Sequence, residues 1–180
     1  MTTTTADVET AVQVLAAAFA DDPVARWLLA GRPGTADLVF RPAVQASAAA
    51  GELAVSPDAA AVWLPRPAGP PPPDDAPLPD ELARLREFLA LTGARHPGGE
   101  EHLYLVFLGV RPAARGRGLG GALLRERLAR ADADGLPAYL EASSARNLPL
   151  YERHGFAPTG DPIQLPDGPR VWPMWRTPRP

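Results

Sequence analysis

The hydrophobic residues near the start of the chain recur with helical spacing. From Asp7 to Asp22 they occupy i, i+3, i+4 and i+7 positions, with Asp7 suited to cap the helix and Pro23 just beyond its end. A similar pattern predicts a second helix over residues 35–50, kinked at Pro42. The first quarter of the chain is therefore expected to be helical.

Apolar runs between turn residues predict the strands. Residues 52–55 and 60–64 are typical of a hairpin, and strands are expected over residues 102–110 and 137–142. Further helices are expected over residues 80–91, 121–133 and 148–154, and short extended segments over residues 156–159, 163–165 and 171–176. This order indicates an α/β (α+β) fold in a single domain, residues 1–180.

A proline-rich stretch interrupts this pattern between residues 65 and 79. It contains four consecutive prolines, Pro70 to Pro73. Proline cannot donate a backbone hydrogen bond in a sheet or a helix interior, so the stretch is expected to be a polyproline-like connection over the surface. A ligand for a partner's proline-binding domain is the alternative interpretation.

Composition excludes several kinds of chemistry. The sequence has no Cys, which excludes disulfides and a thiolate nucleophile, and its 18 basic residues are all Arg, which excludes a P-loop lysine. Three scattered His residues do not suggest a metal site. The net charge of −3 gives no reason to expect nucleic acid or membrane as a partner. No signal peptide or membrane span is visible, so a cytoplasmic protein is expected.

A glycine-rich turn between the strand at 102–110 and the next helix is the clearest functional signal. Uncapped N–H groups at a helix start attract anions, and arginines at 115 and 117 add positive charge. Gly116, Gly118 and Gly121 satisfy G-x-G-x-x-G, with Glu141 about 20 residues further on, as in dinucleotide-binding folds. The hairpin expected after Glu141, in place of further strand–helix units, disfavours that interpretation.

The same turn also satisfies the acyl-CoA signature Arg/Gln-x-x-Gly-x-Gly/Ala, as Arg115-x-x-Gly118-x-Gly120. With the second motif at residues 147–156 (NLPLYERHGF), the chain resembles the GNAT superfamily of acyl-CoA N-acyltransferases. The resemblance implies a mixed, mostly antiparallel sheet splayed at a bulge and flanked by helices, with acetyl-CoA as acyl donor and no metal. It implies acyl-CoA contacts from Leu108, Val110, Arg115, Gly116, Arg117, Gly118, Leu119, Gly120 and Asn147.

Within that superfamily, residues 11–21, 110–122 and 137–156 are similar to the puromycin N-acetyltransferase branch. The implied acceptor is the primary amine of a small molecule, such as an aminonucleoside or another antibiotic. Relatives line the acceptor site with the region that here holds Asp21, Asp22 and Trp27. A protein or peptide N-acetyltransferase and a non-catalytic acyl-CoA sensor remain alternatives, and a monomer or a homodimer is compatible with the sequence. Residues 1–6 leave little room for the first strand of such folds.

Acyl transfer from a thioester to an amine needs a base for the ammonium and an acid for the departing thiolate. Glu141, at a strand end, is the candidate base, and Tyr151, whose phenol stays protonated at neutral pH, is the candidate acid. The alternatives are an exposed carboxylate at 141 that only attracts a cationic amine and a buried Tyr151 that only anchors its helix. For Asn147 the alternative to an acyl-CoA contact is a helix N-cap. His102 competes as base but is expected to be a surface residue. The resemblance also implies a bulge at residues 108–110 that frees the Val110 N–H, and Gly109 favours it because glycine within a strand often marks a bulge.

Overall fold

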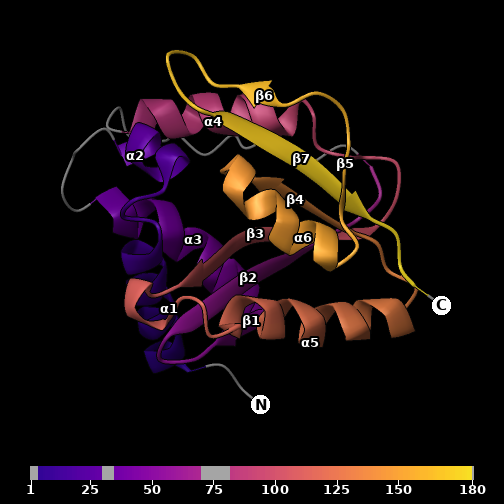
Figure 1. Cartoon of the computed structure of the whole chain (residues 1–180), viewed down its shortest axis with the longest axis horizontal. Helices are drawn as coiled ribbons and strands as arrows, with labels where there is room; N and C mark the ends of the chain where they lie inside the picture. Colours follow the sequence, from indigo (N-terminus) through magenta and orange to yellow (C-terminus); the bar gives the residue numbers. More distant parts are fainter. Residues whose placement is uncertain (1–3, 30–34, 70–81, 180) are drawn as a thin grey trace.

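The computed structural model describes residues 4–29, 35–69 and 82–179, which form a mixed sheet with helices around it (Figure 1). The strands are β1 (Leu53–Val55), β2 (Ala59–Arg66), β3 (His102–Val110), β4 (Ala138–Ala142), β5 (Ala157–Pro158), β6 (Ile163–Gln164) and β7 (Arg170–Arg176). The helices are α1 (Thr5–Ala18), α2 (Pro23–Leu29), α3 (Thr35–Ala49), α4 (Ala83–Gly93), α5 (Leu119–Ala133) and α6 (Leu148–Arg153), with 3-10 turns η2 (Pro112–Ala114) and η3 (Ala145–Asn147). Residues 70–73, the proline run, lie outside the described residues.

The sheet has seven strands in the order β1-β2-β3-β4-β7-β5, with β6 paired to β7. Among the described residues, β3 and β4 pair in parallel and all other pairings are antiparallel. The predicted mixed, mostly antiparallel sheet is therefore confirmed. A doubly wound dinucleotide fold would need a mostly parallel sheet, so this topology excludes that alternative.

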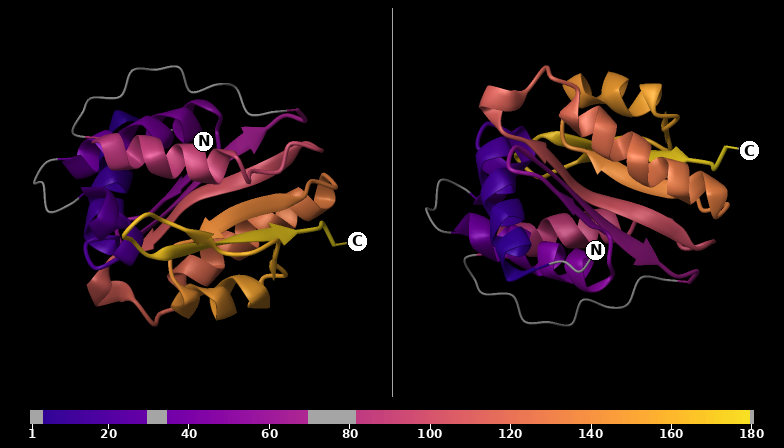
Figure 2. Two further views of the ribbon diagram at one scale, coloured as in Figure 1. Left: turned by 90° about the horizontal axis from the view of Figure 1, so that it is seen from above. Right: turned by 90° about the horizontal axis from the view of Figure 1, so that it is seen from below.

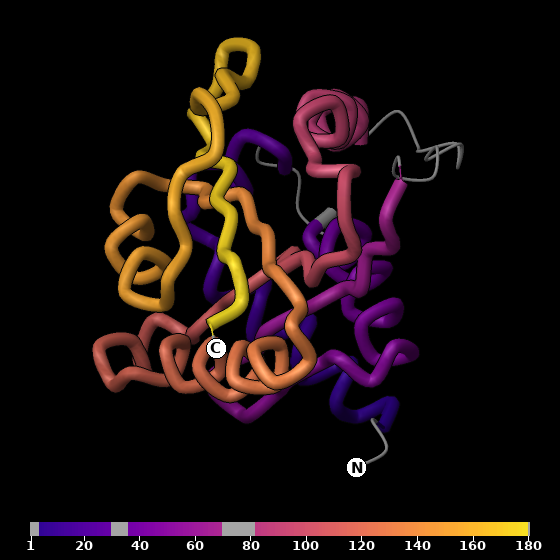
Figure 3. Tube along the Cα trace, turned by 90° about the vertical axis from the view of Figure 1, so that its right-hand side faces the viewer, coloured from indigo at the N-terminus to yellow at the C-terminus, as the bar shows by residue number. Residues whose placement is uncertain are grey.

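Alternate residues of β2 point into two different cores, as the period of a strand requires. Ala60 and Val62 pack with α1 and α3, whereas Ala61 and Trp63 pack with α5 and α6. Figure 2 shows these helix pairs on opposite sides of the sheet. A third apolar cluster joins α2 and α4 to β6 and β7. Figure 3 shows α4, seen end on, and the β6–β7 hairpin at the same end of the molecule.

The start of α1 differs from the prediction by one turn. Thr4, not Asp7, is the N-cap: the Asp7 N–H donates to Thr4 Oγ1 at 3.2 Å, and the Thr4 N–H donates to the Asp7 carboxylate at 2.8 Å. This reciprocal pair is a capping box, in which an acidic residue three positions after the cap completes the motif. Helix α1 begins at Thr5, within the segment where the first strand was expected to be short or absent, and residues 1–3 of that segment lie outside the described residues.

Two prolines also have positions that the pattern did not predict. Helix α1 ends at Ala18, and Pro23 is the first residue of α2, where a missing N–H costs nothing. Pro65 and Arg66, expected in the proline-rich connection, extend β2 instead. This is tolerated because β1 pairs with β2 only between Ala60 and Val62, so β2 has no strand on that side of Pro65 within the part of the chain that the structure describes.

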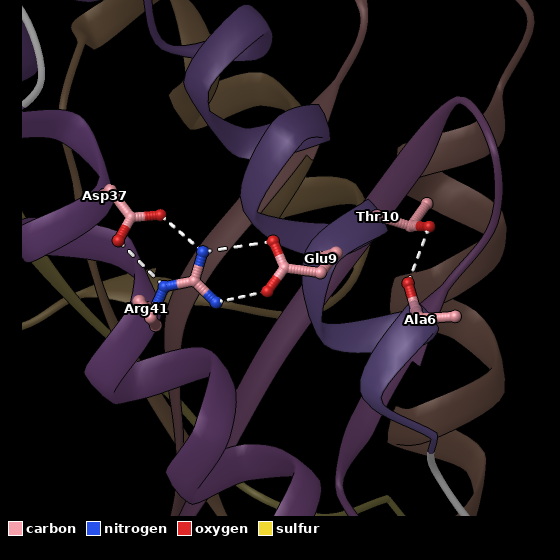
Figure 4. A network of polar contacts seen from close by, with 5 residues as sticks. All are labelled: Ala6, Glu9, Thr10, Asp37 and Arg41. Atoms are coloured by element: carbon pink, nitrogen blue, oxygen red, sulfur yellow. Dashed lines mark hydrogen bonds and ion pairs between the residues drawn. The ribbon is translucent and has the colours of Figure 1, made fainter.

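Two polar clusters hold helices in place. Arg127, which interrupts the apolar face of α5, is buried and donates to the Glu52 carboxylate at 2.5 and 2.9 Å. On the surface, Arg41 of α3 donates to Asp37 one turn away and to Glu9 of α1, both at 2.6 Å (Figure 4). Every charged group in these clusters has an opposite charge as its partner, which is the usual arrangement for ions that serve structure.

Candidate active site

Strands β3 and β4 separate partway along their length. Their pairing runs from Leu103 with Ala138 to Leu105 with Leu140 and then stops. One residue later, β3 carries an extra residue opposite β2, because Val62 pairs with Phe107 and Trp63 with Leu105. The bulge is therefore at Val106, and its predicted position at residues 108–110 is wrong.

Gly109 has a different role from the one predicted. A Cβ at this position would lie 2.9 Å from the Ala18 Cβ and 3.0 Å from Leu15 Cδ2, both in α1. The absence of a side chain lets α1 pack directly on β3. Gly109 is therefore needed for the close approach of a helix and not for the bulge.

The register of β3 directs backbone donors into the gap between β3 and β4. The Arg111 N–H donates to the Asp58 carbonyl of the β2 side at 2.9 Å. Bonding alternates along an antiparallel ladder, so Gly109 also faces β2, while the N–H groups of Leu108 and Val110 face away from it. On that side β4 no longer pairs with β3. These two backbone groups are therefore available to a ligand.

The glycine turn leads directly into α5. Gly116 and Gly118 have φ of +78° and +77°, a left-handed conformation that side chains rarely adopt, and a Cβ at either would meet no atom within 4 Å. Gly118 is the N-cap of α5 and provides no side-chain cap. The first N–H groups of α5 thus have no side-chain cap, which leaves them available to a phosphate.

Arg115 is partly committed to the protein itself. Its guanidinium donates to the Ala18 carbonyl at 2.7 Å and so satisfies the C-terminal end of α1. The residue also lines the cavity described below. Arg115 therefore joins the glycine turn to α1, and the phosphate contact stays a prediction.

A cavity of about 680 Å³ lies at the separation of the two strands. Its wall brings together Leu108, Val110, Arg115, Gly120, Asn147, Tyr151, Glu141, Asp21 and Asp22 from the predicted site. The predicted residues outside the wall are Gly116, Arg117, Gly118, Leu119 and Trp27. The first three belong to the adjoining turn, and Leu119 is the first residue of α5. Trp27 is buried in the α2–β7 core and donates from its indole N–H to the Pro166 carbonyl at 3.0 Å.

Tyr151 of α6 lies in the cavity wall with its ring in the core beside Phe156. Among the described residues its hydroxyl has no hydrogen-bond partner. Burial, and secondarily the negative charge of Asp22, raise the pKa of the phenol above its usual value. The hydroxyl therefore keeps its proton at neutral pH and is free to donate it. Nearby, Asn147 is the N-cap of α6, but its amide makes no capping bond and faces the cavity.

Glu141 of β4 is not an exposed strand-end carboxylate. Its side chain is only 4% exposed, and it accepts a hydrogen bond from the Tyr104 hydroxyl at 2.7 Å. Burial raises the pKa of Glu141 to about 7, and Tyr104 and Tyr139 offset this in part. The Tyr139 hydroxyl and Glu141 Oε1 are both buried without a hydrogen-bond partner. Tyr139 is nevertheless near enough to Glu141 to lower the pKa of its carboxyl group. A carboxyl group with a pKa near 7 suits general base catalysis.

His102 was expected at the surface and is instead 1% exposed. Its Nε2 lies 3.0 Å from His96 Nε2, and its Nδ1 lies 2.9 Å from the Glu100 carbonyl oxygen. His96 Nδ1 in turn lies 4.0 Å from Glu141 Oε1. The burial has a physical cause, since both imidazoles pack against Tyr139 in an aromatic cluster. His102 therefore does not reach the cavity, because His96 lies between it and Glu141.

Asp22 contacts a residue that the sequence did not indicate. Its Oδ1 caps α2 by accepting from the Val24 and Ala25 N–H groups at 2.9 and 3.0 Å, and its Oδ2 accepts from the Ser143 hydroxyl at 2.5 Å. Asp21, by contrast, is exposed at the cavity wall. Asp22 is thus held in place by α2 and by the residues just after β4.

Three residues of the site were missed. Tyr104 had a usable signal, because it shares a face of β3 with His102, two residues away, and Glu141 ends a neighbouring strand. Ser143 and His96 lie in connecting segments without periodicity, and no pattern in the sequence indicates what they contact.

Comparison with known proteins agrees with this geometry. The profile of the acetyltransferase (GNAT) family matches residues 80–156. A crystal structure described as histone acetyltransferase HPA2 and related acetyltransferase, from Corynebacterium glutamicum, is 30% identical and covers 100% of this chain and 96% of its own, with a TM-score of 0.67. This 30% identity over nearly the full length of both chains shows the family of the protein. It belongs to the GNAT family.

Other relatives are more distant or match only part of the chain. Arylalkylamine N-acetyltransferase 2 from Aedes aegypti has the same fold, with a TM-score of 0.72, 14% identity and coverage of 99% of this chain and 98% of its own. A mycothiol acetyltransferase of Jonesia denitrificans is 40% identical over 81 residues, which are 43% of this chain and 25% of that protein. The matched segment thus spans about a quarter of the length of this relative. No helix within the described residues is long and apolar enough to cross a membrane.

Proposed function

We propose that this protein transfers the acetyl group of acetyl-CoA to the primary amine of a small molecule. One observation carries the proposal: a single cavity, at the separation of β3 and β4, contains a carboxyl group with a pKa near 7 and a protonated phenol with a free hydroxyl. These are the base and the acid that amide formation from a thioester requires.

The residues around the glycine turn suit acetyl-CoA. The uncapped N-terminus of α5, together with Arg117 and the turn glycines, would hold the pyrophosphate. The Leu108 and Val110 N–H groups and the Asn147 amide would bind the amide-rich arm between the phosphates and the sulfur. When bound, acetyl-CoA supplies the acetyl group as an activated thioester. The Val110 N–H would polarise its carbonyl oxygen.

Glu141 and Tyr151 then divide the proton transfers. Glu141 accepts one proton from the ammonium group, which frees the nitrogen lone pair to form the new C–N bond. As the C–S bond breaks, Tyr151 donates its proton to the sulfur, and the second proton lost by the amine restores the phenol. The remaining proton leaves Glu141 for water when the products depart.

The remaining wall of the cavity supports a proposal for the kind of acceptor. It is lined by apolar side chains of α2, α3 and α4, among them Leu28, Phe40 and Phe88, and Leu38 and Leu89 are exposed at 48% and 37%. Asp21 is a carboxylate at the same wall. An amine with an apolar or aromatic body fits this combination, because the body can be buried while the ammonium group faces carboxylates. Puromycin-like aminonucleosides and other antibiotic amines belong to this class.

A screen of primary amines with acetyl-CoA, which measures release of free thiol, tests the proposal. It should include aminonucleosides, arylalkylamines, aliphatic amines and short peptides. Turnover should be fastest with apolar or aromatic amines and should fall in Glu141→Gln but not in Glu126→Gln, an exposed carboxylate on α5. Preference for peptides would favour a protein acetyltransferase, and tight acetyl-CoA binding without turnover of any amine would favour a sensor.

A further inference from the structure

A line of buried polar groups extends from Glu141 away from the cavity. Glu141 lines the cavity, whereas His96 and His102 do not. His96 follows α4, and His102 begins β3, so the three side chains come from separate parts of the fold. The side chains of Glu141 and His96 are 4% and 8% exposed, and His102 is 1% exposed. Water therefore has little access to the contacts between them.

The contacts determine which nitrogen of each imidazole carries a proton. The Glu100 carbonyl can only accept, so His102 Nδ1, 2.9 Å away, must be the donor and carries the hydrogen. In a neutral ring the other nitrogen is then an acceptor. With both rings neutral, His102 Nε2 accepts from the His96 Nε2–H, 3.0 Å away, and His96 carries its one ring hydrogen on Nε2.

This assignment leaves His96 Nδ1 as an acceptor that faces Glu141 Oε1. The 4.0 Å between them is too long for a hydrogen bond, and Oε1 is buried without a partner. While Glu141 is ionised, Oε1 and His96 Nδ1 are both acceptors and cannot form a hydrogen bond with each other. When Glu141 is protonated, a shift of roughly 1 Å allows its O–H to donate to His96 Nδ1.

The charged and titratable groups around this contact come from every neighbouring element. The Arg66 guanidinium of β2 lies 5.5 Å from the centre of the Tyr104 ring and lowers the pKa of both His96 and Glu141. Tyr104 donates to the Glu141 carboxylate, and Tyr139 lies beside it. Arg95, just after α4, acts on Tyr139. Burial is the main cause that lowers the pKa of His96 to about 4, and the charge of Arg66 adds to it, so the His96 ring is neutral at neutral pH. The repulsion from His102 acts only when His102 is itself protonated, so it plays no part in the neutral pair. The 4.0 Å contact is therefore not an ion pair.

We propose that His96 and His102 are positioning residues that present an unprotonated ring nitrogen to Glu141 and so favour the protonated form of its carboxyl group. The inference rests on the proposed function in one respect: it gives the proton taken from the acceptor amine a hydrogen-bond acceptor. Tyr104 favours the carboxylate and His96 favours the acid. Glu141 is thus held between two contacts of opposite effect, which suits a group that must change protonation in every cycle.

The tautomers can be tested on the unmodified protein without acetyl-CoA or an amine. The chain has three histidines, so a long-range ¹H–¹⁵N spectrum contains three imidazoles, which His96→Phe and His102→Phe assign. We expect His102 to be protonated on Nδ1 and His96 on Nε2 at pH 7. A His96 ring protonated on Nδ1, or on both nitrogens, would overturn the proposal. Because no substrate is present, this outcome is independent of whether the protein acetylates any amine.

The effect on Glu141 can be measured by infrared titration of its carboxyl band, identified by its loss in Glu141→Gln. His96→Phe should lower the pKa of Glu141 by about one unit, because the acceptor for its O–H is lost. His102→Phe should lower it as well, because His96 can then donate from Nδ1 to the carboxylate. Tyr104→Phe removes a donor and is the matched control, with a shift of opposite sign.

A solely structural role predicts a different result. In that case the two His variants would lower stability while leaving the carboxyl titration at about pH 7, which would refute the proposal. Where an acceptor amine is known, the pH dependence of kcat/KM should move to lower pH in both His variants, in parallel with the infrared titration. A fall in kcat/KM without this movement would also count against it.

Discussion

The two ends of the cavity are built in different ways. At the glycine turn, backbone groups provide the site: left-handed glycines, the uncapped start of α5 and the free N–H groups of Leu108 and Val110. At the carboxylate end, side chains from separate elements provide it, with Glu141 between Tyr104 and His96. The turn end is open and made of one continuous segment, whereas the carboxylate end is buried and assembled across the fold.

This difference separates binding from proton transfer. Backbone donors have a fixed charge distribution and do not titrate, so they suit a phosphate that is equally charged throughout the reaction. Glu141 has unmet hydrogen-bonding capacity and a pKa near 7, which suits a group that must gain and lose a proton. The surface cluster of Arg41, Asp37 and Glu9 shows the contrast, since Arg41 lowers the pKa of both carboxyl groups and keeps them ionised.

The largest effect is expected at the glycine turn. Gly118→Glu should abolish detectable acetyl-CoA binding by calorimetry, because a carboxylate would occupy the anion site. Gly135→Glu is a matched control: Gly135 lies just after α5, with φ of +67°, and a Cβ there would also meet no atom within 4 Å. Both substitutions strain the backbone similarly, so equal loss of binding in the two variants would show that strain and not the anion site is responsible.

Glu141→Gln should produce the next largest effect, at the carboxylate end. Loss of a general base is expected to reduce kcat/KM by roughly 10²- to 10⁴-fold at pH 7.5. The folded pKa is raised to about 7, so the active carboxylate accumulates as pH rises through 7, and the rate of the wild type should rise with it. In the variant this rise should disappear, leaving only the titration of the amine. Acetyl-CoA affinity should be unchanged, and a raised acceptor KM with normal kcat would instead assign Glu141 a binding role only.

The same difference explains what the sequence could predict. The spacing of Arg115, Gly118 and Gly120 is a local signal, since a turn and a helix start are made by consecutive residues. The order of strands and helices followed from periodicity in the same way. The bulge at Val106 and the burial of His102 were missed because each depends on pairing and packing between distant segments. His96 lies in a loop, and nothing in its neighbours indicates that it faces Glu141.

Tyr151→Phe should reduce kcat by about 10²-fold, the usual scale for a general acid. The ring remains packed beside Phe156, so folding and acetyl-CoA affinity should be nearly unchanged. Stopped-flow or steady-state kinetics at saturating acetyl-CoA measure the loss. If kcat with acetyl-CoA is the same in Tyr151→Phe as in the wild type, Tyr151 only packs against the core and water protonates the thiolate.

Stability should also report the state of Glu141. Its folded pKa is raised from 4.5 to about 7, so the group contributes stability below pH 4.5 that is lost as pH rises through 7. The free energy of unfolding of Glu141→Gln should therefore rise relative to that of the wild type from pH 4.5 upward. The difference should level off above pH 7 at about 3 kcal/mol, measured by urea unfolding. Glu126→Gln, on the exposed face of α5, should show no such trend. A flat difference for Glu141→Gln would mean that water reaches the carboxylate in the folded protein.

The smallest effect is expected from Arg115→Ala, and it tests whether the turn end serves binding alone. A phosphate contact far from the reacting carbon stabilises ground and transition states equally, so the KM for acetyl-CoA should rise about tenfold with kcat nearly unchanged. Because Arg115 also donates to the Ala18 carbonyl, the variant should lose about 1 kcal/mol of unfolding free energy. Arg117→Ala separates the two roles, since Arg117 is exposed in the same turn and should raise the KM without a change in stability. A large fall in kcat at saturating acetyl-CoA in Arg115→Ala would show that the turn also positions the thioester for attack, because α1 packs on Gly109 and a shift of α1 would reach the Val110 N–H.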